Sequence, residues 1–434
     1  MATAHSSPSS RPCSMDADRL ASKPEQGDHN EAISRGAGPL AGLEVLELAH
    51  VMAGPTAGRI LADLGAEVIK LERLEGEDCR RMAPPYVGDE AAGFLMLNRN
   101  KRAIAVDLKS DDGKAILKRL ARRADVLIEN FRPGTMAKFD AGYETLARDN
   151  PGLIYCEISG FGRSGPYAQR GGFDVVAQAM SGILSVTGEG PDRPPVKAGV
   201  PVADIGAALY AVIGILAALA QRQQTGRGQR VDTSLFEAAA SFMSWPAAMY
   251  LANGEAPPPM GTAHPLDAPY QAFEAADGWF IVAAANQSTW LRLIEALGLP
   301  ELGEDPRFAD NPDRVEHLQE LVAILTPIFL RKPKAEWMQL LDAAGVPVGP
   351  INGVHEMLAD PQLAARGMVR RSWHAQLGEL TTLSTPITFS DAQLDQRHGA
   401  PRVGESTHEV LAGLGFSDDQ IDAMRASGTI AAAS

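Results

Sequence analysis

The feature that most constrains the fold is a regular alternation of strand-like and helix-like segments between residues 43 and 158. Residues 43–48 alternate apolar and acidic side chains, as a half-buried strand does, and the Ala-Gly-Pro sequence at 53–55 leads into a helical segment that ends at Gly65. Such alternation predicts βαβ units and a parallel sheet with both faces covered, which places the chain in the α/β class. Both patterns recur further on, with a helix at 114–123 and strands at 66–71, 103–106, 125–128 and 153–158.

A glycine-rich segment, residues 159–166, follows the last of these strands. Its glycine content excludes a helix and predicts a loop at the carboxyl end of a strand. Open α/β sheets bind their ligands at such loops, so we expect the functional site at this edge of the sheet.

A second, smaller domain is predicted after a Pro/Gly cluster at 254–269, which has the composition of a linker. It is expected to contain a strand at 279–283, amphipathic helices at 289–297 and 315–330, and a closing Gly/Pro loop at 345–350. Beyond it, residues 380–383 are strand-like and an amphipathic helix follows His408.

Composition excludes several classes of function. The 434 residues carry a net charge of −14, which disfavours binding to nucleic acids and to anionic bilayers. The uncharged stretches 205–221 and 238–254 fall just short of the ~18 residues of a membrane span and are expected to be buried core segments. The three cysteines, Cys13, Cys79 and Cys156, match neither a disulfide framework nor a metal site, which favours a reducing, cytoplasmic location.

The segment before Pro39 has neither the apolar core of a signal peptide nor the acid-poor composition of a transit peptide. We expect residues 1–38 to be a disordered tail. Further along, the first βα turn lacks the G-x-G-x-x-G of dinucleotide binders and offers only Gly54 and Gly58, and the chain has no P-loop, H-E-x-x-H or G-x-S-x-G motif. These absences favour a Rossmann-like sheet without a dinucleotide and give no support to metal or serine-hydrolase chemistry.

Two aspartates precede predicted helices and allow two interpretations each. Asp204 stands just before the apolar segment that starts at Ile205, and Asp174 follows Gly171, Gly172 and Phe173. Either residue has the position of a simple N-cap. A carboxylate at a helix N-terminus is also held ionised by the helix dipole, and an ionised carboxylate can attack an activated carbonyl.

Four basic residues, Arg73, Lys109, Arg132 and Lys138, fall at or near predicted strand ends. Each alone has the pattern of a solvated surface charge, but together they mark the edge where a phosphate-bearing ligand would lie. His50, after the first strand, is interpreted as structural.

Six sequence blocks together resemble the family III CoA-transferases, the CaiB/BaiF type, which includes formyl-CoA transferase and succinyl-CoA-dependent dicarboxylate transferases. The resemblance extends from about Leu40 to Ile421. Its blocks are His-Val-Met-Ala-Gly-Pro at 50–55, Leu-Gly-Ala-Glu-Val-Ile-Lys-Leu-Glu at 64–72, Asn-Arg-Asn-Lys-Arg at 98–102, Glu-Asn-Phe-Arg-Pro-Gly at 129–134, Thr-Gly-Arg-Gly-Gln at 225–229 and Gly-Val-Pro-Val-Gly-Pro at 345–350.

The resemblance implies a Rossmann-like large domain that binds CoA, a smaller α+β domain, and two identical chains interlocked as rings. On this basis the predicted division is a tail at 1–38, the large domain at 39–235, a linker at 236–264, the small domain at 265–350, a linker at 351–370 and a C-terminal part at 371–434 that returns to the large domain.

The resemblance also implies roles for individual residues. Asp204 matches the family's nucleophile and Asp174 a supporting acidic residue of the active site. Asp204 is expected to attack a thioester and to carry CoA as an aspartyl thioester, with no metal or redox cofactor. The positions expected to contact CoA are Val51, Ala53, Arg73, Val106, Lys109, Asn130, Phe131 and Lys138.

Departures from the family's branches narrow the substrate. The related acyl-CoA racemases have a His-Asp pair where this chain has Phe173 and Asp174, which disfavours racemisation or epimerisation. The oxalate-using branch has Gln at the position of Met52 and a four-glycine loop where residues 261–265 read Gly-Thr-Ala-His-Pro. We therefore expect succinyl-CoA as donor and a small dicarboxylic acid as acceptor, with a racemase or a non-catalytic CoA-binding protein as the alternatives.

Overall fold

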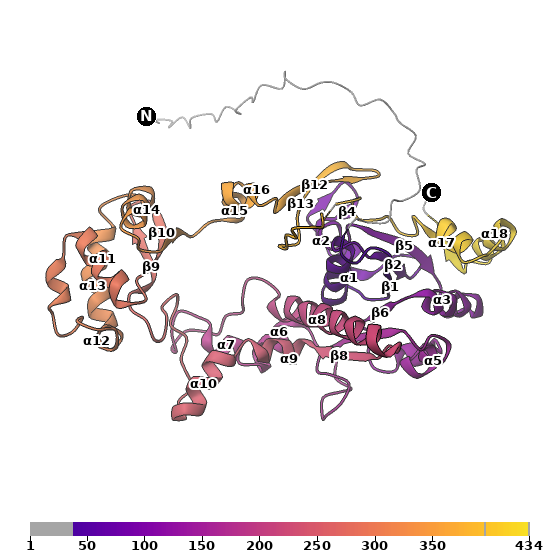
Figure 1. Ribbon diagram of the computed structural model, residues 1–434, viewed down its shortest axis with the longest axis horizontal. Coiled ribbons are helices and arrows are strands. Elements are labelled where there is room, and N and C mark those ends of the chain that lie inside the picture. The colour runs from indigo at the N-terminus through magenta and orange to yellow at the C-terminus, as the bar shows by residue number, and fades with distance from the viewer. Residues whose placement is uncertain (1–37, 395, 433–434) are drawn as a thin grey trace, which may run out of the picture. The chain divides into compact units, whose positions relative to one another are not determined.

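The computed structural model describes residues 38–394 and 396–432, so the tail predicted for residues 1–38 lies, apart from Gly38, outside the described residues. A seven-stranded sheet organises the larger part of the chain, in the order β14-β5-β2-β1-β6-β7-β8 (Figure 1). Neighbouring strands from β5 to β8 pair in parallel, and β14 is antiparallel to β5. The predicted α/β class is confirmed. The strands are β1 (Glu44–Glu47), β2 (Glu67–Glu72), β5 (Lys101–Val106), β6 (Val126–Glu129), β7 (Ile154–Ser159), β8 (Arg230–Ser234) and β14 (Ile430–Ala431).

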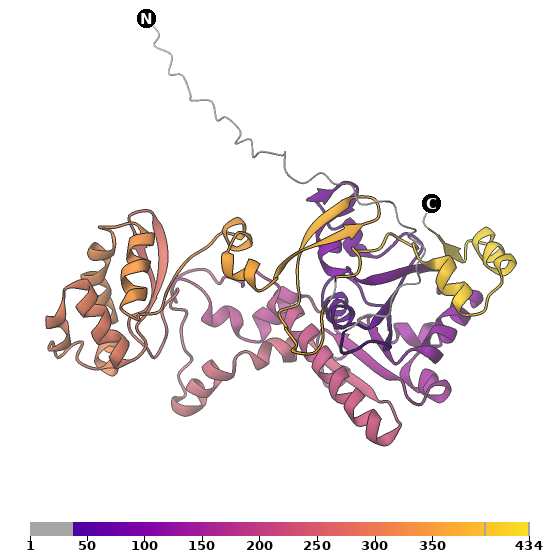
Figure 2. The same ribbon diagram turned by 45° about the horizontal axis from the view of Figure 1, so that its top comes forward.

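Helices cover both faces of this sheet, as the hydrophobic runs of its central strands require. Successive side chains of β1 point to opposite faces: Val45 packs into a core with α1 (Ala53–Asp63) and α8 (Val202–Thr225). Leu46 packs into a second core with α3 (Asp111–Arg123), α5 (Tyr143–Asp149), α17 (Thr407–Gly413) and α18 (Asp418–Ala426) (Figures 1 and 2).

Local sequence explains where α3 begins and ends. The Ser110 hydroxyl accepts a hydrogen bond from the Gly113 N–H at 3.0 Å and so satisfies one of the helix's unpaired donors. Asp111 and Asp112 stand in the first turn and Arg122 and Arg123 in the last, each complementing the helix dipole.

Helix α8 begins at Val202, three residues before the predicted start. By length and composition alone the helix could cross a membrane, whereas the uncharged stretch 205–221 was expected to be too short for that. However, 44% of its most apolar 18-residue window is buried inside the protein. One face packs in the core through Ala207, Ala211 and Ile215, as expected for a core helix, while the opposite face is exposed.

The prediction of a single buried segment at 238–254 is wrong. The chain breaks there into α9 (Leu235–Ser241), which packs in the core, and α10 (Ser244–Asn253), which has no buried residue in this single chain. Hydrophobicity alone could not separate an apolar core helix from an apolar exposed one.

A three-stranded antiparallel sheet, in the order β11-β10-β9, holds a separate aromatic core. Strand β10 and helix α11 match the predicted 279–283 and 289–297, and the predicted helix at 315–330 is broken at His317. Asn286 starts α11 with a capping box. The elements are β9 (Tyr270–Ala275), β10 (Gly278–Ala283), α11 (Gln287–Leu297), α12 (Asn311–Glu316), α13 (Leu318–Phe329), α14 (Lys334–Ala343) and β11 (Val348–Pro350).

The C-terminal segment contacts the seven-stranded sheet and its helices. Beyond the pairing of β14 with β5, Thr385 donates to the buried Asp63 carboxylate at 2.6 Å, and Arg397 donates to the Ala62 and Ala66 carbonyls. The remaining elements are β3 (Tyr86–Val87), β4 (Glu90–Ala91), α2 (Ala92–Leu97), α4 (Thr135–Lys138), α6 (Asp174–Met180), α7 (Ile183–Val186), α15 (Val354–Leu358), α16 (Pro361–Ala365), β12 (Val369–His374), β13 (Gly378–Leu383) and 3₁₀ turns at Asp78–Arg81 and Pro300–Gly303.

Candidate active site

Segments that follow β1, β6 and β7 surround a cavity of about 380 Å³ at the carboxyl edge of the sheet. We call it the aspartate cavity. Its position is the one that parallel α/β sheets use for ligands. Both predicted active-site carboxylates line it, together with residues from all three segments: His50, Val51, Met52, Ala53, Asn130, Phe131, Arg132, Pro133, Ser159, Gly160, Arg170, Phe173, Asp174 and Asp204.

Glycines let the loop after β7 close on itself beside this cavity. A Cβ atom on Gly160 would lie 2.7 Å from the Gly172 Cα, and one on Gly172 would lie 2.6 Å from the Gly160 Cα. The two backbones therefore meet where no side chain fits. This close approach brings Phe173 and Asp174, at the start of α6, next to the strand end.

The structure changes the interpretation of Asp204. It is the third residue of α8, and the N-cap position is held by Pro201, which makes no side-chain capping bond. The alternative that Asp204 is an N-cap is therefore wrong. Within the part of the chain that the structure describes, no group donates a hydrogen bond to the Asp204 carboxylate, which is half-buried and faces the cavity.

Asp174 caps α8, although it belongs to α6. Its Oδ1 atom accepts from the backbone N–H groups of Ala203, at 2.8 Å, and Asp204, at 3.3 Å. Its Oδ2 atom accepts from the side chain of the buried Gln178 at 2.6 Å. Asp174 thus satisfies donors that a helix N-terminus leaves unpaired, and it fixes the backbone of Asp204 in doing so.

Asp204 is not held ionised as the sequence led us to expect. Burial, and after it the negative charge of Asp174, raises the pKa of Asp204 from 3.8 to about 7. The N–H groups of Ala203 and Asp204 at the start of α8 donate to Asp174, not to the Asp204 carboxylate. A carboxyl group whose pKa is near neutrality is a common feature of active sites.

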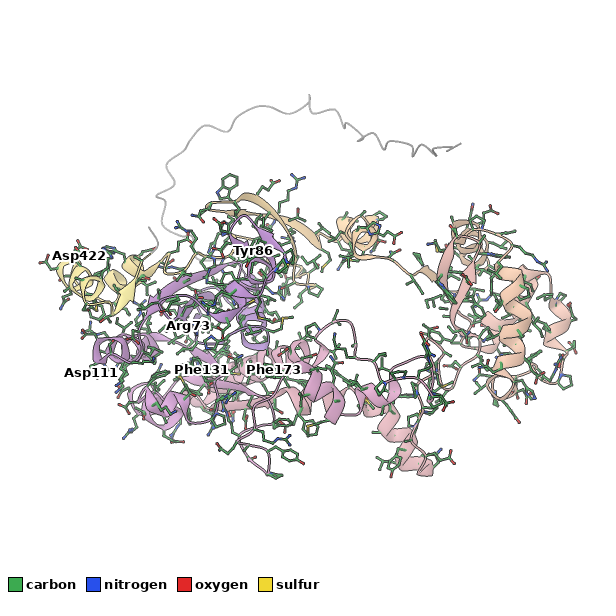
Figure 3. The ribbon with its side chains drawn as sticks, turned by 180° about the vertical axis from the view of Figure 1, so that it is seen from behind. Arg73, Tyr86, Asp111, Phe131, Phe173 and Asp422 are labelled. Carbon is green, nitrogen blue, oxygen red and sulfur yellow. The ribbon has the colours of Figure 1, made fainter. Side chains whose placement is uncertain are left out.

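A second cavity, of about 520 Å³, lies alongside and is lined by Arg73, Val106, Lys109, Phe131 and Phe139, among others. We call it the basic cavity. His50 and Phe131 line both cavities, and their rings are in edge contact with centroids 4.8 Å apart. Figure 3 labels Arg73, which lines the basic cavity, Phe131, which lines both cavities, and Phe173, which lines the aspartate cavity.

Asn130 fixes the loop after β1 to the loop after β6. Its amide accepts from the His50 N–H and donates to the His50 carbonyl, both at 2.9 Å. Burial lowers the pKa of His50, so its imidazole favours the neutral form. His50, interpreted from the sequence as structural, therefore stands between the two cavities.

Seven of the eight predicted CoA-contacting residues line one or both of the cavities. Val51, Ala53 and Asn130 line the aspartate cavity, Arg73, Val106 and Lys109 line the basic cavity, and Phe131 lines both. Lys138, the exposed last residue of α4, lines neither of them. Its contact with CoA stays a prediction.

Two basic side chains that line the aspartate cavity, Arg132 and Arg170, are not among the predicted catalytic or CoA-contacting residues. Arg132 was grouped with the phosphate-binding cations, yet it lies in the aspartate cavity, and Arg170 was missed. Arg170 stacks on the Phe161 and Tyr167 rings, with its guanidinium carbon 5.3 and 4.7 Å from their centroids. Its place in a long loop gave no sequence signal beyond its charge.

No group of three or more His, Cys, Asp or Glu side chains in residues 38–394 and 396–432 is arranged to hold a metal ion.

Comparison with known proteins identifies the class. The profile described as CoA-transferase family III matches residues 40–407. The chain is 42% identical to the succinate–glutarate CoA-transferase of Agrobacterium fabrum, over 87% of this chain and 96% of that protein. It is 40% identical to the acetyl-CoA:oxalate CoA-transferase of Acetobacter aceti, over 85% and 94% respectively. The chain therefore belongs to CoA-transferase family III, as its sequence blocks indicate.

The fold comparison agrees. A crystal structure of a CaiB/BaiF family protein from Brucella suis superposes with a TM-score of 0.80 at 44% identity, covering 87% of this chain and 99% of that one.

Proposed function

We propose that this enzyme transfers CoA from succinyl-CoA to a small dicarboxylic acid through a covalent aspartyl-CoA thioester on Asp204. The observation that supports this most directly is the half-buried Asp204 carboxylate, which faces a cavity at the sheet's carboxyl edge and accepts no hydrogen bond within the described residues. Such an oxygen pair is available to attack a substrate. The relatives' names supply the substrate class.

The proposed reaction begins when the Asp204 carboxylate attacks the thioester carbonyl and the C–S bond breaks. The products are a mixed anhydride on Asp204 and free CoA thiolate. The thiolate attacks the aspartyl carbonyl and releases succinate, leaving Asp204 as a CoA thioester. The acceptor carboxylate repeats these two steps in reverse order, which yields the new acyl-CoA and regenerates the aspartate.

Each step exchanges one activated acyl bond for another, so catalysis depends mainly on positioning. In this proposal Asp174 is a positioning residue, because it holds the backbone of Asp204 through two hydrogen bonds. The basic cavity, with Arg73 and Lys109, would bind the phosphate-bearing end of CoA. Phe131 and His50, which line both cavities, would contact the pantetheine between them.

The acceptor is proposed to be a dicarboxylate such as glutarate. The carboxylate of the acceptor that does not react would lie near Arg132 and Arg170, whose positive charges share the cavity with Asp204. Met52 departs from the oxalate-using branch, but the name of the Acetobacter relative makes oxalate a necessary member of any substrate panel.

Two experiments test this function. Mass spectrometry of mixtures of succinyl-CoA with glutarate, oxalate and other dicarboxylates should show a new thioester. Wild-type enzyme treated with acyl-CoA and hydroxylamine should carry a hydroxamate at Asp204, and Asp204→Ala should remove transfer without unfolding. Full turnover in that variant contradicts the nucleophile assignment.

Acyl-CoA epimerisation is the second candidate, because the neutral His50 imidazole shares the cavity with both aspartates and can accept a proton. Exchange of the substrate's α-proton in deuterated water, without CoA transfer, would favour it over our proposal.

We also propose that two copies of the chain associate, in the interlocked form that the resemblance implies, and that the enzyme is cytoplasmic. Support comes from the exposed apolar face of α8, where Leu209, Tyr210, Ile213 and Leu216 recur at helical spacing. Trp245 and the 81% exposed Leu251 of α10 add to it. The predicted domain boundaries remain part of this proposal.

A further inference from the structure

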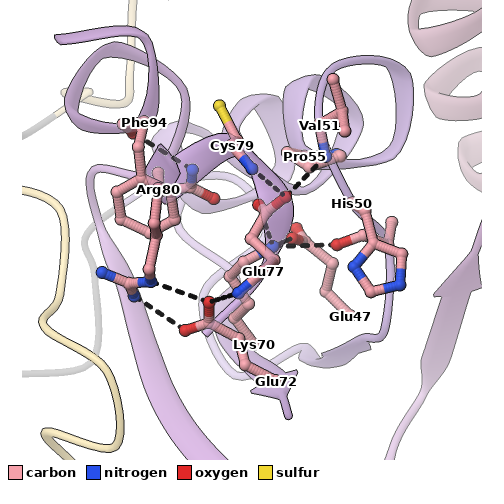
Figure 4. Close-up of polar contacts among 12 residues, drawn as sticks. Glu47, His50, Val51, Pro55, Lys70, Glu72, Glu77, Cys79, Arg80 and Phe94 are labelled. Atoms are coloured by element: carbon pink, nitrogen blue, oxygen red, sulfur yellow. Dashed lines mark hydrogen bonds and ion pairs between the residues drawn. The ribbon is translucent and has the colours of Figure 1, made fainter. Parts of the chain in front are cut away.

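A buried network of four charged residues lies directly beneath the segment that follows β1, and Figure 4 labels three of them, Glu47, Lys70 and Glu77. Lys70 contacts the Glu47 and Glu77 carboxylates at 2.9 Å each, and Lys101 contacts Glu47 at 2.8 Å. All four side chains are almost completely inaccessible to solvent. Buried ion pairs are a weak explanation for stability, so a network placed here asks for another role.

The network holds backbone groups of residues 49–55 at three points. Lys70 donates to the Ala49 carbonyl at 2.9 Å, Glu77 Oε2 accepts from the Val51 N–H at 2.7 Å, and Lys101 donates to the Pro55 carbonyl at 2.8 Å. His50, Val51, Met52 and Ala53, which lie between these points, line the aspartate cavity. The wall of the cavity is therefore anchored from below by charged side chains.

Val51 has a strained backbone. Its φ angle is +64°, in the left-handed region that a β-branched residue rarely occupies. Such conformations persist only where surrounding contacts hold them, and they cluster at functional sites. The short hydrogen bond from the Val51 N–H to the ionised Glu77 is the contact that Val51 itself makes to this network.

Glu77 also fixes the segment after β2. The same Oε2 atom accepts from the Cys79 N–H at 3.3 Å, and the Glu77 N–H donates to Glu72 at 2.9 Å. Residues of this segment line the basic cavity, and Asp78 lines the aspartate cavity. Burial disfavours the charge of Glu77, but Lys70 and the N–H groups of Val51 and Cys79 outweigh it and lower the pKa of Glu77.

We infer that Glu77 is a positioning residue for acyl-CoA: by holding Val51 in its left-handed conformation and anchoring the segment after β2, it sets the shape of the groove in which the thioester meets Asp204. The inference rests on the proposed function for the identity of the ligand. It assigns Glu77 no contact with substrate, since its carboxylate is buried beneath the groove.

The test compares two buried carboxylates changed to amides. Glu77→Gln keeps the size of the side chain but leaves one acceptor oxygen where two are needed, for the Val51 N–H and for Lys70. Asp63→Asn is the matched control, because Asp63 is likewise buried and paired with a basic residue, here Arg99, but lines neither cavity. CoA affinity is measured by calorimetry, alongside KM and kcat for succinyl-CoA.

We expect Glu77→Gln to weaken CoA binding and to raise KM at least tenfold, and Asp63→Asn to change either by less than twofold. A folded Glu77→Gln enzyme with wild-type CoA affinity and KM overturns the inference. Equal losses in both variants also overturn it, because they would show a general effect of destabilisation.

A second background tests whether Glu77 acts through Val51. Glycine adopts positive φ without strain, so Val51→Gly keeps the loop conformation accessible without the hydrogen bond to Glu77. In that background Glu77→Gln should cost less than threefold in CoA affinity. An undiminished tenfold loss there overturns the link to Val51.

One measurement needs no variant. In the wild-type protein the Val51 amide should exchange with deuterated water as slowly as the amides of strand β1, because it bonds a buried carboxylate. Rapid exchange at Val51 overturns the inference even if Glu77→Gln fails to fold. Hydroxylamine trapping at Asp204 is scored separately in wild-type enzyme. A failure of the proposed function is thereby distinguished from a failure of the positioning role inferred for Glu77.

Discussion

Two aspartates in one cavity have different environments, and we propose different roles for them. Asp174 accepts hydrogen bonds from Ala203, Asp204 and Gln178, whereas Asp204 accepts none within the described residues. Hydrogen-bonded carboxylates are stabilised as anions, while a desolvated carboxylate is a stronger nucleophile. This division agrees with a nucleophilic role for Asp204 and a positioning role for Asp174.

The pH dependence of turnover tests this division. Only ionised Asp204 can attack, and its pKa is raised to about 7, so kcat/KM for acyl-CoA should fall about tenfold per pH unit well below pH 7 and level off above it. Asp174→Asn should move the midpoint to lower pH, since the charge of Asp174 contributes to the raised pKa. A profile that is flat from pH 5 to 8 contradicts the assignment.

The free energy of unfolding should also depend on the ionisation of Asp204. It should decrease with rising pH, whereas turnover should increase. The folded-state pKa of Asp204 lies above its ordinary value of 3.8, so folding favours the protonated form, and stability decreases as pH rises from about 4 to about 7. Asp204→Asn removes this penalty and should raise the melting temperature more at pH 8 than at pH 5. The exposed Asp89→Asn serves as control and should give no such difference.

At the scale of elements, α8 depends on a capping group from another helix. Removing that group leaves the Ala203 and Asp204 N–H groups without their acceptor. Asp174→Ala should therefore cost about 1–2 kcal/mol in the free energy of unfolding, measured with urea. Glu189→Ala, at an exposed carboxylate that caps no helix, should cost less; an equal loss for both variants would contradict the capping role.

Helix α1 packs on the buried charge network through a glycine. A Cβ atom at Gly58 would lie 1.8 Å from Glu47 Oε2. Gly58→Ala should therefore push α1 from the sheet and cost about 1–3 kcal/mol in stability, seen as a lower melting temperature. Gly142→Ala is the control, because a Cβ there meets nothing within 4 Å. Equal melting temperatures for the two variants would show that the network yields without cost.

The sequence was most informative where an element depends on its own residues. The alternating run at 43–48 and the buried runs of the next strands predicted β1, β2, β5, β6 and β7. It failed for β8, whose sequence Arg-Val-Asp-Thr-Ser has no apolar run because the strand lies at the sheet's edge. It also misplaced the start of α8, since the capping Asp174 stands thirty residues earlier in the chain.

The candidate site divides in the same way. The family resemblance identified Asp204, Asp174 and the CoA positions, and most of these residues line two adjoining cavities in the structure. The raised pKa of Asp204 and the hydrogen bond from Val51 to Glu77 depend on side chains from distant segments and on burial. Neither follows from local sequence pattern.

At the scale of the whole molecule, the exposed apolar residues of α8 form the surface that we propose for the homodimer. Leu209 and Leu291 are both 47% exposed, on α8 and α11 respectively. Leu209→Asp should convert the proposed homodimer into monomers in analytical ultracentrifugation, because it places a charge in the apolar face. Leu291→Asp should leave the assembly intact. A wild-type monomer, or the same response from both variants, would contradict our choice of interface.

The pairing of β14 with β5 also bears on biosynthesis. Strand β5 is complete early in translation, but the residues that cover its free edge, Ile430 and Ala431, are synthesised much later. Until then the ribosome-bound chain presents an open strand edge, of the kind that recruits other strands and leads to aggregation. Cells producing this enzyme should consequently rely on chaperones to shield that edge while synthesis is completed.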